Sequence, residues 1–419
     1  MKFWTATVQE RVAVACALAM IGGLFFSRAL LSVSMIVMLA NALRPPTVGA
    51  YFQTWYRSVF SMACLGFFFV YLISGLWSAN KSFWWAEVVN KVPFAILPFA
   101  FLSVPLKKPG YRYILFNGIV AMQLSVIAYS LLQLGMNPDY YLEGYEHSHP
   151  LPTTKYGDHI RFSISLVISI LLMCFTLFDG DKGKPGAVQK FFFICSMVLF
   201  VVYIHILAAK TGLLSLYVAA MMYGGYRLGR KSKLMGGILI MAVAALPVVA
   251  YWAVPTFKAK MDYVRLEIDK TMHDQHFDYR FSDAGRMISY ALGTKLIAQN
   301  KWKGVGAGDL MDEMNGAYDS FYPEVIKRER YGPINQFMFT ALCVGIPLSL
   351  ILIPLALSPM FMRVRKSEYL KVTAMVMLAS MMVESMFEIQ FGVFTFLFFT
   401  CLWVNLLGKN EGQTCFEQF

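Results

Sequence analysis

Positively charged side chains stand at the edges of apolar runs, where they could meet an anion at a membrane surface. Lys210 separates two long apolar runs, and His159 and Arg161 open another. A charge at such a turn often extends its head group into the interface, and a lone histidine there is often an ordinary hydrogen-bonded residue. The functional alternative is a set of fixed cations that binds phosphate. Both interpretations stay open at this stage.

Arg286 follows Asp283, which is a plausible N-cap for a helix over 283–299. In the first turn of that helix, a guanidinium and the backbone N–H groups could face one anion. The alternative is a solvated surface arginine. Arg280 precedes the same helix, and we include it among the candidate substrate-binding residues.

Two acidic residues, Glu384 and Glu388, lie four positions apart near the end of an apolar run. This spacing predicts that they share one face of a helix. Carboxylates in a membrane span are costly unless they are paired or functional. They either form structural ion pairs or act on a substrate as a base or orienting group. We take Glu384 and Glu388 as candidate catalytic residues together with Lys210 and Arg286.

Glycines at 304, 306 and 308 form a short loop that only superficially resembles a phosphate-binding motif. No strand precedes it and no Gly-Lys-Ser/Thr follows, so we expect a turn between helices and no nucleotide site. The seven cysteines show no CxxC or Cys/His spacing. We therefore predict neither a metal site nor a disulfide framework.

The composition is that of a polytopic membrane protein. Of the 419 residues, 58% are hydrophobic and 15% charged, with a mean hydropathy of +0.54. A soluble domain carries about 25% charged residues. The net charge of +12 does not indicate nucleic acid, because the polar segment from Val254 to Tyr331 holds 12 basic and 12 acidic residues. The basic excess lies in short loops, where it is a topology signal.

Apolar runs long enough to cross a bilayer predict an all-α protein with about twelve spans. The predicted spans are 11–27, 29–43, 58–77, 82–104, 112–134, 160–178, 189–208, 211–227, 234–254, 333–355, 370–388 and 391–408.

Basic residues are enriched in alternate loops, which predicts that both termini are cytoplasmic. The 135–159 loop and the 255–332 segment then face the opposite side. We therefore divide the chain into a span region (1–254), a helical segment (255–332), a second span region (333–408) and a cytoplasmic tail (409–419).

Three short helices are predicted within the 255–332 segment. The first covers 258–272 and is amphipathic, the second covers 283–299, and the third begins at an Asp309 cap and reaches Tyr318. We expect this segment to lie against the membrane as a lid. No internal repeat is visible, whereas many transporters are built from repeats with paired broken helices.

Four short stretches, in this order and placement, resemble the O-antigen ligase / O-antigen polymerase superfamily of membrane glycosyltransferases, and the resemblance covers most of the chain. His159-Ile-Arg161-Phe-Ser resembles the opening of the sixth span in Bacteroidetes-like members. Lys210-Thr-Gly-Leu-Leu stands where many members have Arg-Ser/Thr-Gly. The other two stretches are Gly285-Arg286 through Gly304-Val-Gly-Ala-Gly308, and Pro333-Ile334-Asn335-Gln336-Phe337, which resembles Pro-His-Asn-Gln-Tyr/Phe.

This resemblance implies transfer of a glycan from undecaprenyl pyrophosphate to an acceptor, at the periplasmic face of the bacterial inner membrane. The acceptor is a lipid A–core sugar for a ligase or a lipid-linked repeat for a polymerase. No metal, nucleotide or other cofactor is implied. Lys210 and Arg286 correspond to the pyrophosphate-binding cations, and Asn335 and Gln336 are candidate substrate-binding residues. A non-enzymatic transporter of lipid-linked glycans is the alternative class.

Two positions depart from the family pattern. Lys210 stands in place of an arginine, which keeps the charge but loses the bidentate fork. Ile334 occupies the place of the family's histidine, which is thought to activate the acceptor, and isoleucine cannot do so. Either Glu384, Glu388 or His159 takes that role, or deprotonation is late and needs little help. Divergence to another acceptor, or loss of activity, are further alternatives.

Overall fold

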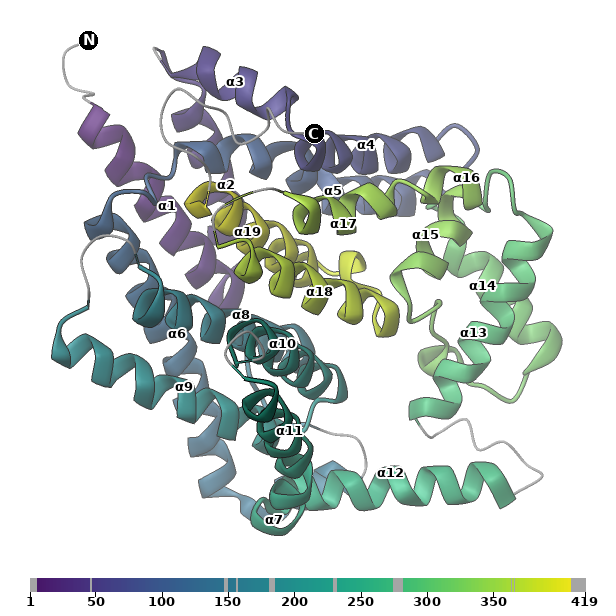
Figure 1. The fold of residues 1–419 in the computed structure, drawn as a ribbon. Helices are drawn as coiled ribbons and strands as arrows, with labels where there is room; N and C mark the ends of the chain where they lie inside the picture. Colours follow the sequence, from purple (N-terminus) through teal and green to yellow (C-terminus); the bar gives the residue numbers. More distant parts are fainter. Residues whose placement is uncertain are drawn as a thin grey trace.

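The computed structural model describes residues 6–45, 47–146, 150–155, 157–180, 185–228, 232–273, 282–362, 364 and 366–407. All regular structure in these residues is helical, which confirms the predicted all-α class (Figure 1). The first part of the chain holds α1 (Ala6–Phe26), α2 (Arg28–Ala42), α3 (Val48–Tyr56), α4 (Val59–Ser74), α5 (Lys81–Ala100), α6 (Pro109–Met136), α7 (Pro138–Glu146), α8 (His159–Phe178), α9 (Ala187–Leu207), α10 (Lys210–Leu228) and α11 (Lys233–Ala253). The rest holds α12 (Pro255–His273), α13 (Ser282–Gln299), α14 (Leu310–Phe321), α15 (Gln336–Val344), α16 (Ile346–Ser349), α17 (Leu352–Phe361), α18 (Glu368–Val383) and α19 (Gln390–Leu407), with short 3₁₀ turns η1 (Phe101–Ser103), η2 (Lys327–Glu329) and η3 (Met386–Glu388).

Within the described residues, seven helices are long and apolar enough to cross a membrane. An eighth is added if α3 and α4, which meet at 80°, form one bent span. Helix α2 is apolar but shorter. The chain therefore has the helices of a multi-pass membrane protein, and the number of twelve spans stays a prediction.

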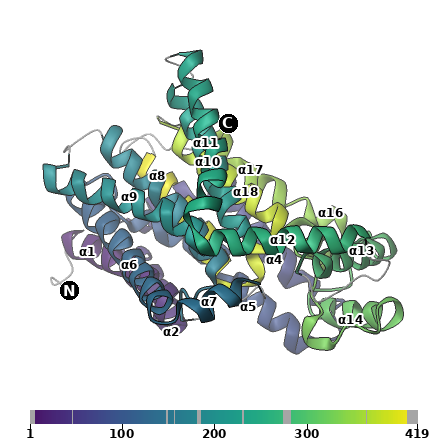
Figure 2. The same ribbon diagram turned by 90° about the horizontal axis from the view of Figure 1, so that it is seen from below.

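Helices α8 and α19 form the centre of the bundle, and α11 lies at its edge. In the best apolar window of α8 and of α19, 83% of the residues are buried within the protein, against 6% in α11. Figure 2 shows α11 projecting beyond the other helices. The buried helices α8 and α19 thus supply a rigid frame for the residues at their ends.

The tenth predicted span, 333–355, is not one helix, so that prediction is wrong. It is divided into α15, α16 and the start of α17, with a break at Gly345. Gly345 has φ +82°, and a Cβ on it would lie 2.3 Å from the carbonyl oxygen of Trp302. The close approach of the chain around Trp302, which a sequence pattern does not reveal, interrupts the helix here.

The glycine loop at 304–308 is a turn, as predicted, and it also joins two parts of the chain. The amide of Val305 donates to Leu342 O at 2.8 Å, and that of Gly306 donates to Cys343 O at 2.9 Å. Gly304 has φ +68°, and a Cβ on it would lie 2.5 Å from Leu342 O. These amides therefore fix the loop to the end of α15.

The three helices predicted in the 255–332 segment are present as α12, α13 and α14. The predicted cap at Asp283 is wrong, whereas Asp309 does occupy the N-cap position of α14 but does not cap it with its side chain. Helix α13 begins at Ser282, so Asp283 lies inside it. Asp309 makes no cap bond; its carboxylate instead accepts hydrogen bonds from the amides of Ala79 and Asn80, each at 2.7 Å. Asp309 thus binds amides that are distant in the sequence, and not the amides in the first turn of α14.

Helices α7 and α12 pack against each other at one end of the bundle (Figure 1). Both are attached to the C-terminal end of α9: Tyr145 donates to Leu207 O at 3.1 Å, and Thr256 donates to Ile206 O at 2.7 Å. The 135–159 loop and the 255–332 segment therefore share one end of the bundle. Which side of the membrane this end faces stays a prediction.

Candidate functional site

The Glu384 carboxylate is a buried junction between three helices. Helix α18 ends at Val383, and Glu384 follows in extended conformation with its side chain 6% exposed. Its Oε1 accepts from Arg286 Nη2 of α13 at 2.9 Å and from Thr211 Oγ1 of α10 at 3.2 Å. Arg286 Nη1 also donates to Val383 O at 3.0 Å. One carboxylate thus fixes the orientation of Arg286.

Arg161 reaches the same junction from the start of α8. Asp158 caps this helix, and its Oδ1 accepts from the Arg161 amide at 3.0 Å. The guanidinium donates to Ser385 O at 3.1 Å and lies 3.9 Å from Glu384 Oε2. The helix cap therefore directs Arg161 to the end of α18.

Lys210 begins α10, where the left-handed conformation of Ala208 (φ 49°) ends α9 and turns the chain. Its Nζ lies 2.6 Å from Asp283 Oδ2 and 3.7 Å from Glu267 Oε2. The Lys210 and Asp283 side chains are 35% and 42% exposed, whereas Glu267 is 2% exposed. The Asp283 amide donates to Glu267, so the start of α13 already has an internal acceptor.

Lys260 on α12 is a further cation near this group, and the sequence analysis missed it. Burial, together with the nearby positive charges of Lys210 and Arg286, lowers the pKa of Lys260 to about 8, although the carboxylates of Glu267 and Asp283 act to raise it. The available signal was the seven-residue spacing of Lys260 and Glu267, which places both on one face of α12.

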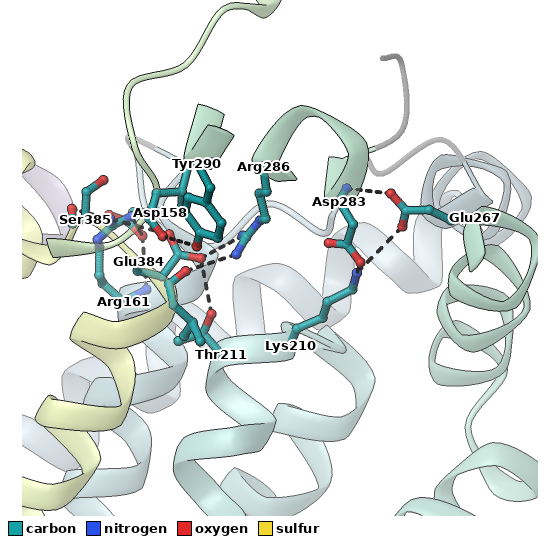
Figure 3. A network of polar contacts seen from close by, with 12 residues as sticks. Asp158, Arg161, Lys210, Thr211, Glu267, Asp283, Arg286, Tyr290, Glu384 and Ser385 are labelled. Atoms are coloured by element: carbon teal, nitrogen blue, oxygen red, sulfur yellow. Dashed lines mark hydrogen bonds and ion pairs between the residues drawn. The ribbon is translucent and has the colours of Figure 1, made fainter. Parts of the chain in front are cut away.

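Lys210 and Arg286 belong to two neighbouring groups of contacts, which Figure 3 shows in one line from Ser385 to Glu267; Asp283, the partner of Lys210, lies one helical turn before Arg286 on α13. We call this line, with Lys260, the charged row. Its cations are Arg161, Lys210, Lys260 and Arg286, and its carboxylates are Asp158, Glu267, Asp283 and Glu384. With four charges of each sign, the row is formally neutral.

Glu388 belongs to a different cluster, so the expectation that it shares a helical face with Glu384 is wrong. It lies in η3, after α18 has ended. Its Oε2 is 2.7 Å from Lys91 Nζ, and Lys91 is also 2.7 Å from Glu87 Oε2. Glu384 pairs with Arg286, whereas Glu388 pairs with Lys91. The end of α18 at Val383 allows the two side chains to reach these different partners.

Lys91 and Glu87, which the sequence analysis also missed, form with Glu388 what we call the buried triad. Lys91 is fully buried, and its ammonium lies 4.6 Å from the centre of the Tyr71 ring. The signal was present in the predicted span 82–104, where a glutamate and a lysine stand four residues apart in an apolar run. A charge inside such a run is a candidate functional residue by default.

A cavity of about 820 Å³ lies beside both clusters. Apolar residues of α1, α2 and α5 form much of its wall. His159 and Arg161 from the start of α8, with Asp158, border it where it meets the charged row. Glu388 of the buried triad also lines it. The cavity therefore reaches Glu388 of the triad and the Asp158–Arg161 end of the charged row, whereas Lys210, Arg286 and Glu384 do not line it.

Asn335 and Gln336 use their side chains inside the protein. Asn335 Oδ1 caps α15, and its Nδ2 donates to Met382 O at 2.6 Å. Gln336 Nε2 donates to Glu388 Oε1 at 2.9 Å, and its Oε1 accepts from the Phe387 amide at 2.7 Å. Both residues thus hold the segment that carries Glu384 and Glu388. Arg280 lies outside the described residues.

A family model described as O-antigen ligase matches residues 195–353. The match contains Lys210, Arg286, Asn335 and Gln336, and it ends before Glu384. No curated protein matches the chain.

Proposed function

The chain belongs to the O-antigen ligase superfamily, and from this premise we propose that it transfers a glycan from undecaprenyl pyrophosphate to an acceptor hydroxyl. The observation that supports this donor most directly is the charged row. It brings Lys210 and Arg286 together from two helices, and each is held in place by a carboxylate. We place the reaction at the periplasmic face of the bacterial inner membrane.

In this proposal, Lys210 and Arg286 bind the pyrophosphate and neutralise the charge that develops as it leaves. Phosphate oxygens take the place of the Asp283 carboxylate, which is exposed enough to exchange. Glu384 is buried and stays in place, so Arg286 keeps its orientation throughout. Lys260 adds a third positive charge from α12.

The other predicted site residues take roles on either side of this centre. We assign His159 and Arg161, at the cavity, to substrate binding. Asn335 and Gln336 hold the segment that carries the two glutamates in position. Arg280 stays a proposed substrate-binding residue. No metal takes part in the proposed reaction.

A lipid A–core sugar is the first candidate acceptor, because the matching family model is described as O-antigen ligase. A second lipid-linked repeat would instead make the protein a polymerase. Purified protein in liposomes, given the lipid-linked donor with or without lipid A–core and with EDTA present, separates the two. Ligation requires the added lipid A–core, whereas polymerisation proceeds with the donor alone.

We expect Arg286→Ala to lower covalent transfer in this assay by about 1,000-fold. Arg328→Ala, which removes an 84% exposed arginine from η2, is the matched control and should retain full transfer. A wild-type protein that forms no product in either arm would refute the enzymatic proposal and favour a transporter. Loss of activity on adding EDTA would refute the metal-independent reaction.

A further inference from the structure

The cavity beside the two ionic clusters is suited to an amphiphile with a polar head group. Leu31 and Met35 contribute to its apolar wall, and His159, Arg161 and Glu388 form part of its polar border. A crevice that only accommodates bilayer lipid has no need of ionisable groups, which are costly at membrane depth. A head group that bears hydroxyls could form hydrogen bonds with these ionisable groups.

The buried triad gives this cavity a group that can take a proton. Two carboxylates, Glu87 and Glu388, share the single ammonium of Lys91, each at 2.7 Å. The triad therefore has a formal charge of −1 in a buried position. One added proton makes it neutral, and neutralisation is favoured where a charge is poorly solvated.

Glu384 is much less suited to this task. Its carboxylate accepts hydrogen bonds from Arg286 and Thr211, and Arg161 lies 3.9 Å away. A proton on Glu384 would leave these arginines without their counter-charge. Glu388 lines the cavity and shares the ammonium of Lys91 with Glu87, so among these three residues a proton on Glu388 removes an excess negative charge.

The triad also extends from the cavity towards the protein surface. The Glu388 side chain is 11% exposed, Lys91 is fully buried and Glu87 is 25% exposed. Because Lys91 contacts both carboxylates, a proton taken up at Glu388 can be exchanged through Lys91 to Glu87. The reaction would then return the triad to its starting state.

We propose that Glu388, supported by Lys91 and Glu87, accepts the proton of an acceptor sugar hydroxyl held in the cavity; this deepens the proposed function and rests on it. The acceptor O–H bond breaks and its proton goes to a Glu388 oxygen. The acceptor oxygen forms the new bond to the anomeric carbon of the donor. The bond from that carbon to pyrophosphate breaks, and the pyrophosphate leaves with the electron pair.

The first test is Glu388→Gln in the liposome transfer assay, run as a pH series with both acceptor arms. Loss of a general base typically lowers kcat by about 100-fold or more. We expect a loss of that size with the donor KM changed by less than threefold. The decline of kcat at low pH in the wild type should also be absent from the variant. An unchanged kcat or an unchanged pH profile would refute the proposal.

A second variant separates catalysis from folding. Lys91→Met/Glu388→Gln removes the cation together with its partner, so it leaves no buried ammonium unpaired. We expect it to fold and to stay as inactive as Glu388→Gln. The matched control is Lys108→Met/Glu10→Gln, which removes an ion pair remote from the cavity and should change kcat by less than twofold.

Wild-type kcat in the Lys91→Met/Glu388→Gln variant would show that the triad is only structural. If Arg286→Ala loses transfer while this double variant retains it, the present inference fails and the proposed function stands. If the wild type forms no product in either acceptor arm, the proposed function fails and this inference fails with it.

Discussion

The charged row and the buried triad differ in charge, exposure and origin. The row is neutral, and its Lys210–Asp283 pair is more than one-third exposed. Its members come partly from α12 and α13 of the 255–332 segment. The triad has an excess negative charge and a fully buried lysine, and it comes from α5 and the turn before α19. The row is therefore suited to exchanging one anion for another, whereas the triad is suited to binding a proton.

The largest effect should come from removing the fixed cation of the row. Arg286→Ala should lower kcat by about 1,000-fold, since one lost donor to a developing anion is worth about 3–4 kcal/mol. Steady-state transfer rates measure this. Arg286→Lys should recover only part of the rate, because lysine lacks the fork that contacts Glu384 and Val383 O together. Full activity of Arg286→Ala would remove the basis for assigning anion binding to the row.

The largest change in the free energy of unfolding should come from a substitution in the buried triad. Lys91→Met leaves two carboxylates without their shared cation, and breaking a buried pair lowers the free energy of unfolding by about 3–5 kcal/mol. Denaturant unfolding in micelles measures the change. Lys108→Met removes an ammonium that is 60% exposed, and the expected change is below about 1 kcal/mol. Equal effects of the two substitutions would contradict the description of the triad as buried and tightly coupled.

Substitution of Asp283 tests whether the phosphates of the donor replace the Asp283 carboxylate beside Lys210. Asp283→Asn removes the carboxylate that occupies Lys210, so the donor should bind about fivefold more tightly, a change of about 1 kcal/mol. Binding of a fluorescent donor analogue measures this. Asp319→Asn changes a 61% exposed carboxylate of α14 and serves as the control, with no expected effect. Weaker binding by Asp283→Asn would indicate that Asp283 positions Lys210 and does not compete with the donor.

The smallest expected effect is a pH dependence of donor kcat/KM that comes from Lys260. The pKa of Lys260 is lowered to about 8, so it is charged below that pH and neutral above it. Donor kcat/KM, which reports groups of the free enzyme, should therefore fall as pH rises from 7 to 9, by about two- to threefold. Lys260→Arg keeps the charge across this range and should remove the decline. A decline that persists in Lys260→Arg would assign it to another group.

Local patterns in the sequence predicted the helices well. The periodicity of the 255–332 segment gave three helices near their observed positions, and the apolar runs gave the all-α class. Local signals failed where a partner lies far away in the chain. Asp309 has the position of a cap but binds the amides of Ala79 and Asn80. The helix breaks at Gly345, inside a continuous apolar run, where the backbone of Trp302 approaches closely.

Only part of the candidate site could be predicted, because the rest depends on partners that lie far away in the chain. Lys210, Arg286, Arg161 and Glu384 were chosen from charge and position, and the fold brings all four together. Their pairing could not be predicted, because it depends on which helix ends meet. The spacing of Glu384 and Glu388 suggested one cluster, but η3 turns the chain between them.

Helix α11 has a consequence for how the bilayer itself can act on this protein. Its residues touch little of the bundle. If α11 crosses the bilayer, hydrocarbon chains surround it and its tilt follows bilayer thickness. A single residue, Val254, separates α11 from α12, which carries Lys260 and Glu267. Because Thr256 holds the start of α12 to α9, we expect a thinner or thicker membrane to act first at the junction of α11 and α12, and to reach Lys260 and Glu267 only through that attachment.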